Sequence, residues 1–545
     1  MEVIARTIAP VKTRIRDGET TPSIIAAALV RLAGVGPETT VLEANCGRPE
    51  FLEALAAAGA RRVSGFSLDR QALFAARERY GDFDLERRDF LHSPHTASFE
   101  VAVGRPPYAS WADIPESTRH ILTSRPFWKG LGVNGDWDLL YTSMIWQIER
   151  LQPGGRLVLL TPSVWLAAAG AAELRHYLAT HGSFEAIFSF GPLALFGEAA
   201  PTLIISYRKG PLEAAEMRRR IRVLEVTERQ ADLETLVPAM LSDFERMSTE
   251  RSYERRRDGY RSYNRRPFAP EGIWYLASPK EEAAVLALEE STTARLSDVA
   301  DIGVGPASGA NEAFALSAEE AAALPRGEQA LVRHFVRAEH CKRWAVSGTA
   351  PYIFADDVPD IETFERRYPT VHGRLSRYRA ILEARYLPNS RRWWDWATVR
   401  GLTSGPDVPA GRIFVPGIDR SPASRYSYSP GSLVGLGDVL TISAKPTMGE
   451  DLRYLLAWLN STLVEEWYRI KGRRAGARVR YNYGAVSAIP YRTIDRRQPG
   501  EVKIHDEIVR LTDELLGGAQ GERRVELERQ INQLISRLLT PVAKR

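Results

Sequence analysis

The stretch "TTVLEANCGRPEFLEALAAAGARRVSGFSLD", residues 39–69, places one helical pattern between two strand-like runs. Residues 39–47 form an apolar run that ends in a glycine turn. Residues 49–60 repeat leucine and alanine at helical spacing, and residues 61–69 return to a strand. The same alternation continues to about Gly210. Strands that alternate with helices predict an α/β fold with a doubly wound, largely parallel, Rossmann-like sheet.

Shifts in composition divide the rest of the chain. Residues 1–210 form the predicted α/β domain, and residues 211–270, with "ERRRDGYRSYNRRPF", are basic and aromatic without a clear core period, which predicts a connector. Residues 271–495 are irregular and rich in Trp, Tyr and Arg, which predicts a second, mixed α/β domain. Residues 496–545 carry two amphipathic patterns and predict a helical hairpin. This hairpin either docks a partner or packs on its own domain.

The overall composition is that of an ordinary globular chain. It has 545 residues, with 73 Lys plus Arg and 68 Asp plus Glu, so the net charge is only +5 and does not by itself indicate a nucleic-acid partner. Cys46 and Cys341 give neither a disulfide framework nor a zinc spacing, so we expect no metal and a reducing, cytoplasmic location. The start resembles no signal peptide, and no apolar run is long enough to span a bilayer, so no membrane contact is expected.

Three predicted strand ends carry candidate ligand contacts, because parallel α/β sheets bind ligands at the carboxyl ends of their strands. Gly47 lies in the turn after the first strand, where a glycine lets the backbone approach an adenosine-containing ligand. Ser67 and Asp69 end the second strand at the position of a ribose contact, although Asp69 also fits a helix cap. Asp89 and Phe90 follow the third strand, either as adenine contacts or as a cap and a core residue.

The run "FEVAVGRPPYASW", residues 99–111, ends an apolar strand in an uncommon turn. Pro106 and Pro107 fix the backbone and leave their carbonyl groups unshared, and Tyr108 can stack on a planar base. A purely structural turn does not ordinarily need this combination. We therefore interpret the turn as part of a binding pocket.

Taken in order, these motifs resemble those of the adenine-specific (N6) DNA methyltransferases of restriction-modification and phage-defence systems. "GETTPSIIAAALVRLAG" is similar to the family's N-terminal cofactor motif, "VLEANCGRPEFL" to its cofactor loop, and "VGRPPY" to its catalytic Asn-Pro-Pro-Tyr motif. "LALFGEAAPTLIIS" resembles the motif whose aromatic residue, here Phe196, helps to hold the flipped base. Downstream, "RIFVPGIDR" and "YLLAWLNSTLVEEWYRIKG" resemble the family's target-recognition domain. The resemblance covers roughly the whole chain except the tail.

The resemblance implies that S-adenosylmethionine is the cofactor and that double-stranded DNA is the partner, with the target adenine flipped out of the duplex. It also assigns roles to individual residues. The implied cofactor contacts are Thr21, Glu43, Gly47, Ser67, Asp89 and Phe90. The implied catalytic positions are Arg105, Pro106, Pro107, Tyr108 and Phe196.

Three positions depart from the family pattern. Arg105 stands at the catalytic Asn position, and a guanidinium only donates hydrogen bonds and stays charged. It cannot accept from the adenine amino group, and it sets a positive charge beside a nitrogen that becomes positive. Ser67 replaces the ribose-binding acid, and Pro49 replaces a glycine, so the three departures together predict relaxed cofactor binding and lost methyl transfer. Arg105 then either binds a phosphate or plugs the pocket by pairing with an acid such as Asp89.

Arginine–aromatic clusters are the predicted DNA contacts, because arginine binds phosphates and reads guanine. For a single arginine a solvated surface position is the stronger alternative, whereas the loop "KGRRAGARVRYNYG" as a set favours DNA. The main candidates are Arg265, Arg266, Arg473, Arg474, Arg478 and Arg480. Further candidates are Arg255, Arg256, Arg257, Arg391 and Arg392. The neighbouring residues Trp393, Trp394 and Trp396 are predicted to be core.

The leading hypothesis is a DNA-binding protein on a degenerate adenine methyltransferase scaffold, acting in a restriction-modification or phage-defence system with partner subunits. The alternative is an active methyltransferase with an atypical catalytic motif. These two differ in cofactor affinity and in methyl transfer. A third class is an interaction scaffold, which would not bind duplex DNA even at low salt.

Overall fold

The computed structural model describes residues 20–92, 98–193, 195–196, 201–387, 391–400, 411–421, 423–475 and 478–539. The chain divides into two compact units, Met1–Glu282 and Ala283–Arg545. The boundaries predicted at residues 210 and 270 both lie inside the first unit.

The first unit is built on one ten-stranded sheet with the order β3-β2-β1-β4-β5-β7-β6-β8-β10-β9. The strands from β3 to β5 in this order pair in parallel, β7 is antiparallel to both of its neighbours, and β6 pairs with β8 in parallel. The strands are β1 Thr40–Glu43, β2 Arg62–Ser67, β3 Asp84–Arg87, β4 Phe99–Gly104, β5 Leu151–Pro162, β6 Gly182–Ser189, β7 Thr202–Lys209, β8 Ile221–Val226, β9 Glu254–Arg256 and β10 Tyr260–Arg265. The predicted doubly wound α/β domain is confirmed.

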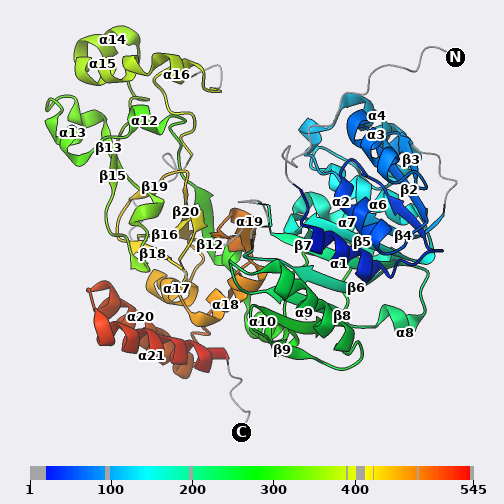
Figure 1. The fold of residues 1–545 in the computed structure, drawn as a ribbon. Helices are drawn as coiled ribbons and strands as arrows, with labels where there is room; N and C mark the ends of the chain where they lie inside the picture. Colours follow the sequence, from blue (N-terminus) through cyan, green and yellow to red (C-terminus); the bar gives the residue numbers. More distant parts are fainter. Residues whose placement is uncertain are drawn as a thin grey trace. The chain divides into compact units, whose positions relative to one another are not determined.

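Helices cover both faces of this sheet (Figure 1). Alternate residues of β5 face opposite ways, so that Leu157 and Leu159 join one core cluster while Val158 and Leu160 join the other. The helices and short 3₁₀ turns are α1 Ser23–Ala33, α2 Pro49–Ala57, α3 Arg70–Arg79, η1 Phe90–His92, η2 Trp111–Asp113, α4 Glu116–Ser124, α5 Pro126–Gly130, α6 Leu139–Arg150, η3 Ser163–Leu166, η4 Ala169–Ala171, α7 Ala172–His181, α8 Ala214–Met217 and α9 Leu233–Arg246.

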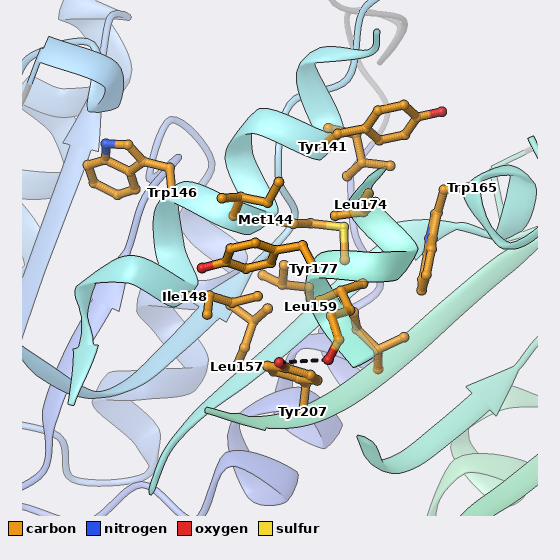
Figure 2. Close-up of a cluster of buried hydrophobic side chains, with 14 of the residues drawn as sticks. Tyr141, Met144, Trp146, Ile148, Leu157, Leu159, Trp165, Leu174, Tyr177 and Tyr207 are labelled. Carbon is orange, nitrogen blue, oxygen red and sulfur yellow. Dashed lines mark hydrogen bonds between the residues drawn. The ribbon is translucent and has the colours of Figure 1, made fainter. Parts of the chain in front are cut away.

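Figure 2 shows the core on the face that α6 and α7 cover. Met144 and Ile148 of α6 lie against Leu157 and Leu159 of β5. The Tyr207 hydroxyl donates a hydrogen bond to the Leu178 carbonyl oxygen at 2.9 Å, which satisfies a buried polar group within this apolar layer. This packing fixes the strand whose neighbour, β4, ends in the Pro-Pro-Tyr turn.

The expected connector over residues 211–270 is instead part of the sheet. β8, α9, β9 and β10 continue the first unit, and β8 pairs with β6 and β10. The many basic residues interrupt the apolar periodicity from which these strands could have been predicted. Arg222 lies over the Phe244 ring with its guanidinium carbon 3.8 Å from the ring centre, and Arg261 pairs with Glu225 at 2.6 Å. The aliphatic part of an arginine side chain can cover a hydrophobic core while its guanidinium group pairs with an acid. A strand rich in arginine therefore lacks the expected alternation of apolar and polar residues.

The second unit holds the predicted mixed α/β domain. Its largest sheet has five strands in the order β12-β20-β16-β18-β14, and two three-stranded sheets have the orders β15-β13-β19 and β17-β22-β21. The strands are β11 Ala294–Arg295, β12 Ala300–Val304, β13 Val332–Val336, β14 Trp344–Ala345, β15 Ala350–Ile353, β16 Arg412–Pro416, β17 Ile418–Asp419, β18 Ser427–Ser429, β19 Val434–Gly435, β20 Val439–Ala444, β21 Arg473–Ala475, β22 Arg478–Arg480 and β23 Pro490–Tyr491.

Short helices surround these sheets. They are α11 Leu296–Val299, α12 Asn311–Phe314, α13 Ala318–Ala323, η5 Gln329–Leu331, η6 Ala338–His340, α14 Ile361–Arg367, α15 Pro369–Arg377, α16 Arg379–Glu383, α17 Leu452–Leu459, α18 Thr462–Lys471 and α19 Tyr483–Ser487, and α10 Pro279–Ser291 leads into the unit. Trp394 and Trp396 are buried and Trp393 packs against them, so the prediction that these tryptophans are core is confirmed.

The predicted helical hairpin at the end of the chain consists of α20 Pro499–Leu516 and α21 Gly521–Leu539. Its apolar faces are buried in the core of the second unit through Ile508, Leu511, Ile531 and Ile535. The Glu528 carboxylate of α21 accepts a hydrogen bond from the Trp344 indole at 2.7 Å. The apolar faces of the hairpin thus pack on its own unit. Across the described ranges, no helix is both long and apolar enough to cross a membrane.

Candidate functional site

The carboxyl ends of three neighbouring strands bring most of the predicted site residues to one edge of the first unit's sheet. Glu43 ends β1, Ser67 ends β2 and Gly104 ends β4, and β1 pairs in parallel with both of its neighbours. A Cβ atom on Gly104 would lie 2.5 Å from Glu43 Oε1, so only glycine allows this close approach. The cofactor loop and the catalytic turn are therefore in direct contact.

Gly47 and Ser67 form the floor of the predicted cofactor loop. A Cβ atom on Gly47 would lie 3.1 Å from Ser67 Oγ, so the glycine keeps the loop close to β2. Ser67 Oγ accepts a hydrogen bond from the Asp69 backbone N–H at 3.1 Å. The Asp69 carboxylate accepts from the N–H groups of Gln71 and Ala72 at the start of α3, so Asp69 is a helix cap, as the alternative interpretation held.

Pro49 occupies the first position of α2 and is exposed. The N–H group at this position has no partner within a helix, so proline costs the helix nothing there. The departure at Pro49 is therefore compatible with an intact strand–turn–helix. What it removes is one backbone donor from the loop.

Glu43 and Thr21 are almost fully buried, at 1% and 2% exposure. Glu43 Oε1 accepts from the Asn45 backbone N–H at 3.3 Å, and burial raises the pKa of Glu43 to about 8. The Thr21 backbone N–H donates to Glu50 Oε1 at 3.1 Å. Glu50, in the first turn of α2, was not among the predicted site residues, and no motif position pointed to it.

Asp89 and Phe90 lie at the end of β3, where adenine contacts were predicted. Asp89 Oδ1 accepts from the Leu91 backbone N–H at 3.0 Å, which makes the carboxylate a cap of the turn η1. Phe90 is buried and meets the Trp146 ring edge-on, with ring centres 5.2 Å apart. Both residues thus have structural roles, and their roles as adenine contacts stay predictions.

The catalytic turn brings Arg105, Tyr108 and Phe196 together, and we call these three residues the base pocket. The Arg105 side chain is 6% exposed, with its guanidinium carbon 3.8 Å from the centre of the Phe196 ring. Its Nη2 donates a hydrogen bond to the Tyr108 hydroxyl at 3.3 Å. Pro106 and Pro107, which lie between Arg105 and Tyr108 in the sequence, are both buried. A charged donor therefore lies against both aromatic residues that the resemblance assigns to a flipped base.

Two residues that sequence reasoning missed hold this turn in place. Asn45 Nδ2 donates to the Arg105 carbonyl oxygen at 3.3 Å, which ties the cofactor loop to the base pocket. Asp138 caps α6 and also accepts from the Ala109 backbone N–H at 3.2 Å. The position of Asp138 before an amphipathic helix is typical of a helix N-cap and could have been predicted. Nothing in the sequence indicated the contact between Asn45 and Arg105.

Arg265 is not a surface arginine, so its predicted role as a DNA contact is wrong. It is 5% exposed, stacks on Phe268 at 3.9 Å and pairs with Glu282 at 3.5 Å. Its Nε donates to the Arg266 carbonyl oxygen at 3.0 Å. A guanidinium engaged in this way cannot reach a phosphate. Arg266 itself is exposed.

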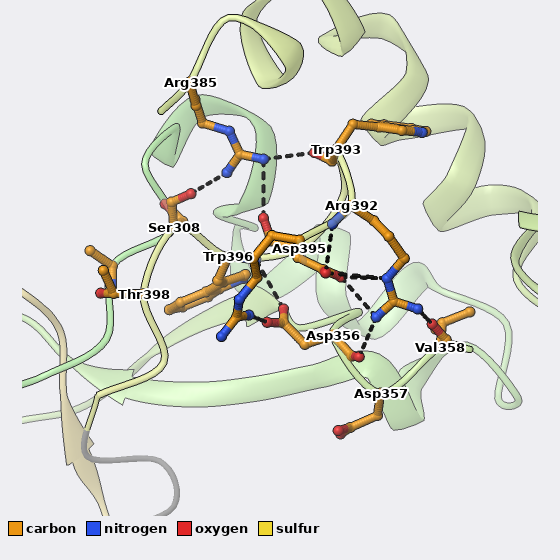
Figure 3. Close-up of polar contacts among 12 residues, drawn as sticks. Ser308, Asp356, Asp357, Val358, Arg385, Arg392, Trp393, Asp395, Trp396 and Thr398 are labelled. Carbon is orange, nitrogen blue, oxygen red and sulfur yellow. Dashed lines mark hydrogen bonds and ion pairs between the residues drawn. The ribbon is translucent and has the colours of Figure 1, made fainter. Parts of the chain in front are cut away.

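Several of the further candidates are also engaged within the protein. Figure 3 shows Arg392 hydrogen-bonded to Asp395 and to the carbonyl oxygens of Asp356 and Val358. Arg391 pairs with Asp356. Arg257 pairs with Asp243 at 3.1 Å, whereas Arg255 and Arg256 are exposed on the edge strand β9.

The arginine-rich loop of the second unit forms the hairpin of β21 and β22. β22 also pairs with β17, with Arg480 opposite Ile418. Arg480 is exposed. Arg473, Arg474 and Arg478 belong to the two strands, but their side chains lie outside the described residues. Among the predicted DNA contacts, Arg480, Arg266, Arg255 and Arg256 are thus the described residues that are exposed.

The chain is similar to known restriction-modification proteins in sequence and in fold. Residues 68–196 match the family model described as Eco57I restriction-modification methylase. The chain is 32% identical over 243 residues to the Type II methyltransferase M.MjaIV of Methanocaldococcus jannaschii, covering 44% of this chain and 79% of that protein. It is 24% identical over 521 residues to the Type II methyltransferase M.HindII of Haemophilus influenzae, covering 92% of this chain and 94% of that protein.

Among solved structures, the Type IIL restriction-modification enzyme MmeI in complex with DNA has a TM-score of 0.61. The match covers 95% of this chain and 72% of that chain at 10% identity, and it shows a shared fold. Together with the similarity to M.MjaIV over most of its length, these findings show that the chain belongs to the adenine-N6 DNA methyltransferase family of restriction-modification systems.

Proposed function

We propose that this protein binds double-stranded DNA on a methyltransferase scaffold whose methyl transfer has been lost at the base pocket. The observation that carries the proposal is the position of Arg105, which stacks on Phe196 and donates to Tyr108. The two aromatic residues that would hold a flipped base are thereby engaged by the protein's own side chain.

The charge of Arg105 also opposes the reaction. Adenine-N6 transfer needs acceptors for the two amino hydrogens, and it develops positive charge on the attacking nitrogen. A guanidinium donates only and keeps its charge, so it removes one acceptor and repels the developing charge. Electrostatic complementarity is usually the largest single contribution to catalysis, so this replacement acts on the step that matters most.

S-adenosylmethionine is the cofactor that the residues present fit. Gly47 holds the cofactor loop close to Ser67 at the end of β2, and Thr21 and Glu43 offer buried oxygen atoms for hydrogen bonds. When bound, the cofactor would supply an activated methyl group. Ser67 offers only a neutral hydroxyl to the ribose, and that hydroxyl already accepts from Asp69.

The DNA contacts are proposed on the exposed arginines. Arg480 on β22 and the arginine-rich hairpin that contains it are the leading candidates in the second unit, and Arg266 is exposed in the first. MmeI, which shares the fold, was solved with DNA bound. Partner subunits in a restriction-modification or phage-defence system are part of the same proposal, as the similarity to methyltransferases of such systems suggests.

An active methyltransferase with an atypical motif is the second candidate, favoured by the retained Pro106, Pro107 and Tyr108 and by the strand–turn–helix that Pro49 leaves intact. The test measures transfer of a tritiated methyl group from S-adenosylmethionine to unmethylated DNA of high sequence complexity, which needs no known recognition site. DNA binding is measured on the same preparation over a range of salt concentrations.

We expect DNA binding that weakens steeply with salt and no methyl incorporation. Incorporation by the wild-type protein would establish the active enzyme instead. Absence of DNA binding at low salt would leave an interaction scaffold as the function of the chain.

A further inference from the structure

Residues 109–139 follow the Pro-Pro-Tyr turn, and both ends of this segment are fixed beside it. The Ala109 backbone N–H donates to the Asp138 carboxylate at 3.2 Å, and the Leu139 N–H donates to the Ala109 carbonyl oxygen at 3.0 Å. The turn η2 and the helices α4 and α5 lie between these two ends. The segment therefore starts and finishes next to Tyr108 of the base pocket.

The inner side of this segment is packed into the first unit. Leu122 of α4 and Trp128 of α5 are buried in a hydrophobic cluster against which Tyr108 also packs. Arg119 Nη1 donates to the Trp111 carbonyl oxygen at 3.3 Å, which holds α4 to η2. Because the segment is anchored in this way, its outward residues keep defined positions relative to the base pocket.

The outward side includes an exposed corner where α4 ends and α5 begins, and we call residues 123–130 the α4–α5 corner. All of these residues are exposed except Trp128. Phe127 is 43% exposed, and its ring meets the buried Trp128 ring edge-on, with ring centres 4.9 Å apart. The Phe127 ring thus presents apolar surface to solvent in an orientation that its buried neighbour fixes.

Two exposed cations flank Phe127. Arg125 lies two residues before it and Lys129 two residues after it. Residues 117–135 also include Arg119 but contain no Asp or Glu, whereas the chain as a whole has a net charge of only +5. The α4–α5 corner is therefore a locally positive surface with an aromatic ring at its centre.

Duplex DNA fits the chemistry and the place of this surface. Arginine and lysine bind phosphates, and an exposed aromatic ring can stack on a base of any sequence. A duplex that presents a base to Tyr108 extends over the residues around the pocket, and the α4–α5 corner is anchored there. Apolar side chains that enter a duplex separate neighbouring base pairs and kink the helix, and phenylalanine is one of the residues used in this way.

We propose that Phe127 inserts between base pairs of bound DNA beside the base pocket, while Arg125 and Lys129 bind the phosphates on either side. The inference rests on the proposed function for DNA as the partner, and it adds a DNA-distorting residue in the first unit. The distortion needs no flipped base in the pocket, so it is compatible with the contact of Arg105 and Phe196.

Unwinding of plasmid DNA tests the insertion without a known recognition site. The full-length protein is bound to a nicked circular plasmid, DNA ligase seals the nick, and the linking number is read after the protein is removed. The variants are Phe127→Ala and Phe127→Trp. Phe74→Ala is the matched control, because Phe74 on α3 belongs to the same unit and is 67% exposed. All proteins are compared at equal amounts bound to the plasmid.

We expect the wild type to lower the linking number in proportion to the protein bound, F127A to abolish this shift, and F127W and F74A to keep it. F127A should also weaken DNA binding by about tenfold at every salt concentration, since stacking on a base releases no counterions. Arg125→Ala and Lys129→Ala should each reduce the salt dependence of binding by about one phosphate contact. Urea denaturation of each variant confirms that it is folded.

An equal shift in linking number for F127A and the wild type, or an equal loss in F74A, would overturn the insertion. So would a wild type that binds the plasmid without changing its linking number, and this result would leave the proposed function intact. Unchanged salt dependence in both R125A and K129A would overturn the phosphate contacts. A wild type that does not bind DNA at low salt would overturn the inference together with the proposed function.

Discussion

The guanidinium of Arg105 lies face-on against Phe196, with its central carbon 3.8 Å from the ring centre, and hydrogen-bonds Tyr108 from the same position. The end of β4 and the segment between β6 and β7 are thereby joined through one side chain. The contact has two consequences. It stabilises the turn that ends β4, and it covers the face of the Phe196 ring that a flipped adenine would need under the proposed function.

The stabilising effect is measurable by a double-mutant cycle between Arg105→Ala and Phe196→Ala. A desolvated cation–π contact contributes about 2 kcal/mol, so we expect the two substitutions to be coupled by about 1–2 kcal/mol in the free energy of unfolding. Urea denaturation of the wild type, both single variants and the double variant gives this value. Additive losses within about 0.5 kcal/mol would show that the two side chains do not interact in solution.

Stability should depend on pH through Glu43. Its pKa is about 8 in the folded protein against an ordinary value of 4.5, so the folded state holds a proton that the unfolded state has lost. Between these two values, stability therefore falls as pH rises, by up to about 1.4 kcal/mol per pH unit. The E43Q variant has no such group, so its free energy of unfolding should rise relative to that of the wild type from pH 5 to pH 8. Parallel stability profiles for the two proteins would contradict the raised pKa.

Ser67→Asp should strengthen binding at the ribose end of the cofactor. A carboxylate at this position could accept from the ribose hydroxyls, and a charged hydrogen bond contributes about 1.5–3 kcal/mol. We expect S-adenosylmethionine and 5′-methylthioadenosine to gain affinity by a similar factor of about tenfold or more, since both carry the ribose. Calorimetric titration measures both, and a gain for only one of them would place the ribose elsewhere.

Truncation of the exposed Arg480 and of the buried Arg265 should affect DNA binding and stability differently. Arg480→Ala removes an exposed cation, so we expect weaker DNA binding with a salt dependence reduced by about one phosphate contact and unchanged stability. Arg265→Ala breaks a buried ion pair and an aromatic contact, so we expect a loss of about 3 kcal/mol in stability and an unchanged salt dependence. DNA titrations over a range of salt, with urea denaturation, separate the two effects. A reduced salt dependence in R265A would restore that residue as a DNA contact.

The sequence predicts most of the architecture of the first unit, because hydrophobic residues recur in its strands and helices at the spacing typical of each. The prediction fails over residues 221–265. There Arg222 lies over an aromatic ring and Arg261 pairs with an acid, so both arginines occupy positions where apolar residues would be expected. The resemblance assigns Arg105, Tyr108 and Phe196 to one pocket, whereas the stacking of Arg105 on Phe196 and its hydrogen bond to Tyr108 were not predicted. The roles of Glu50 and Asn45 could not be predicted, because each depends on the spatial meeting of loops that no period or spacing encodes.

The central claim is that Arg105 prevents methyl transfer, and the most direct measurement compares the wild type with Arg105→Asn. Both proteins are incubated with tritiated S-adenosylmethionine and unmethylated DNA of high complexity, after their binding of DNA and cofactor has been matched. We predict no incorporation by the wild type and measurable incorporation at adenine by R105N, because the variant restores an acceptor and frees Phe196 and Tyr108. Incorporation by the wild type, or none by an R105N protein that binds both DNA and cofactor, would contradict the claim.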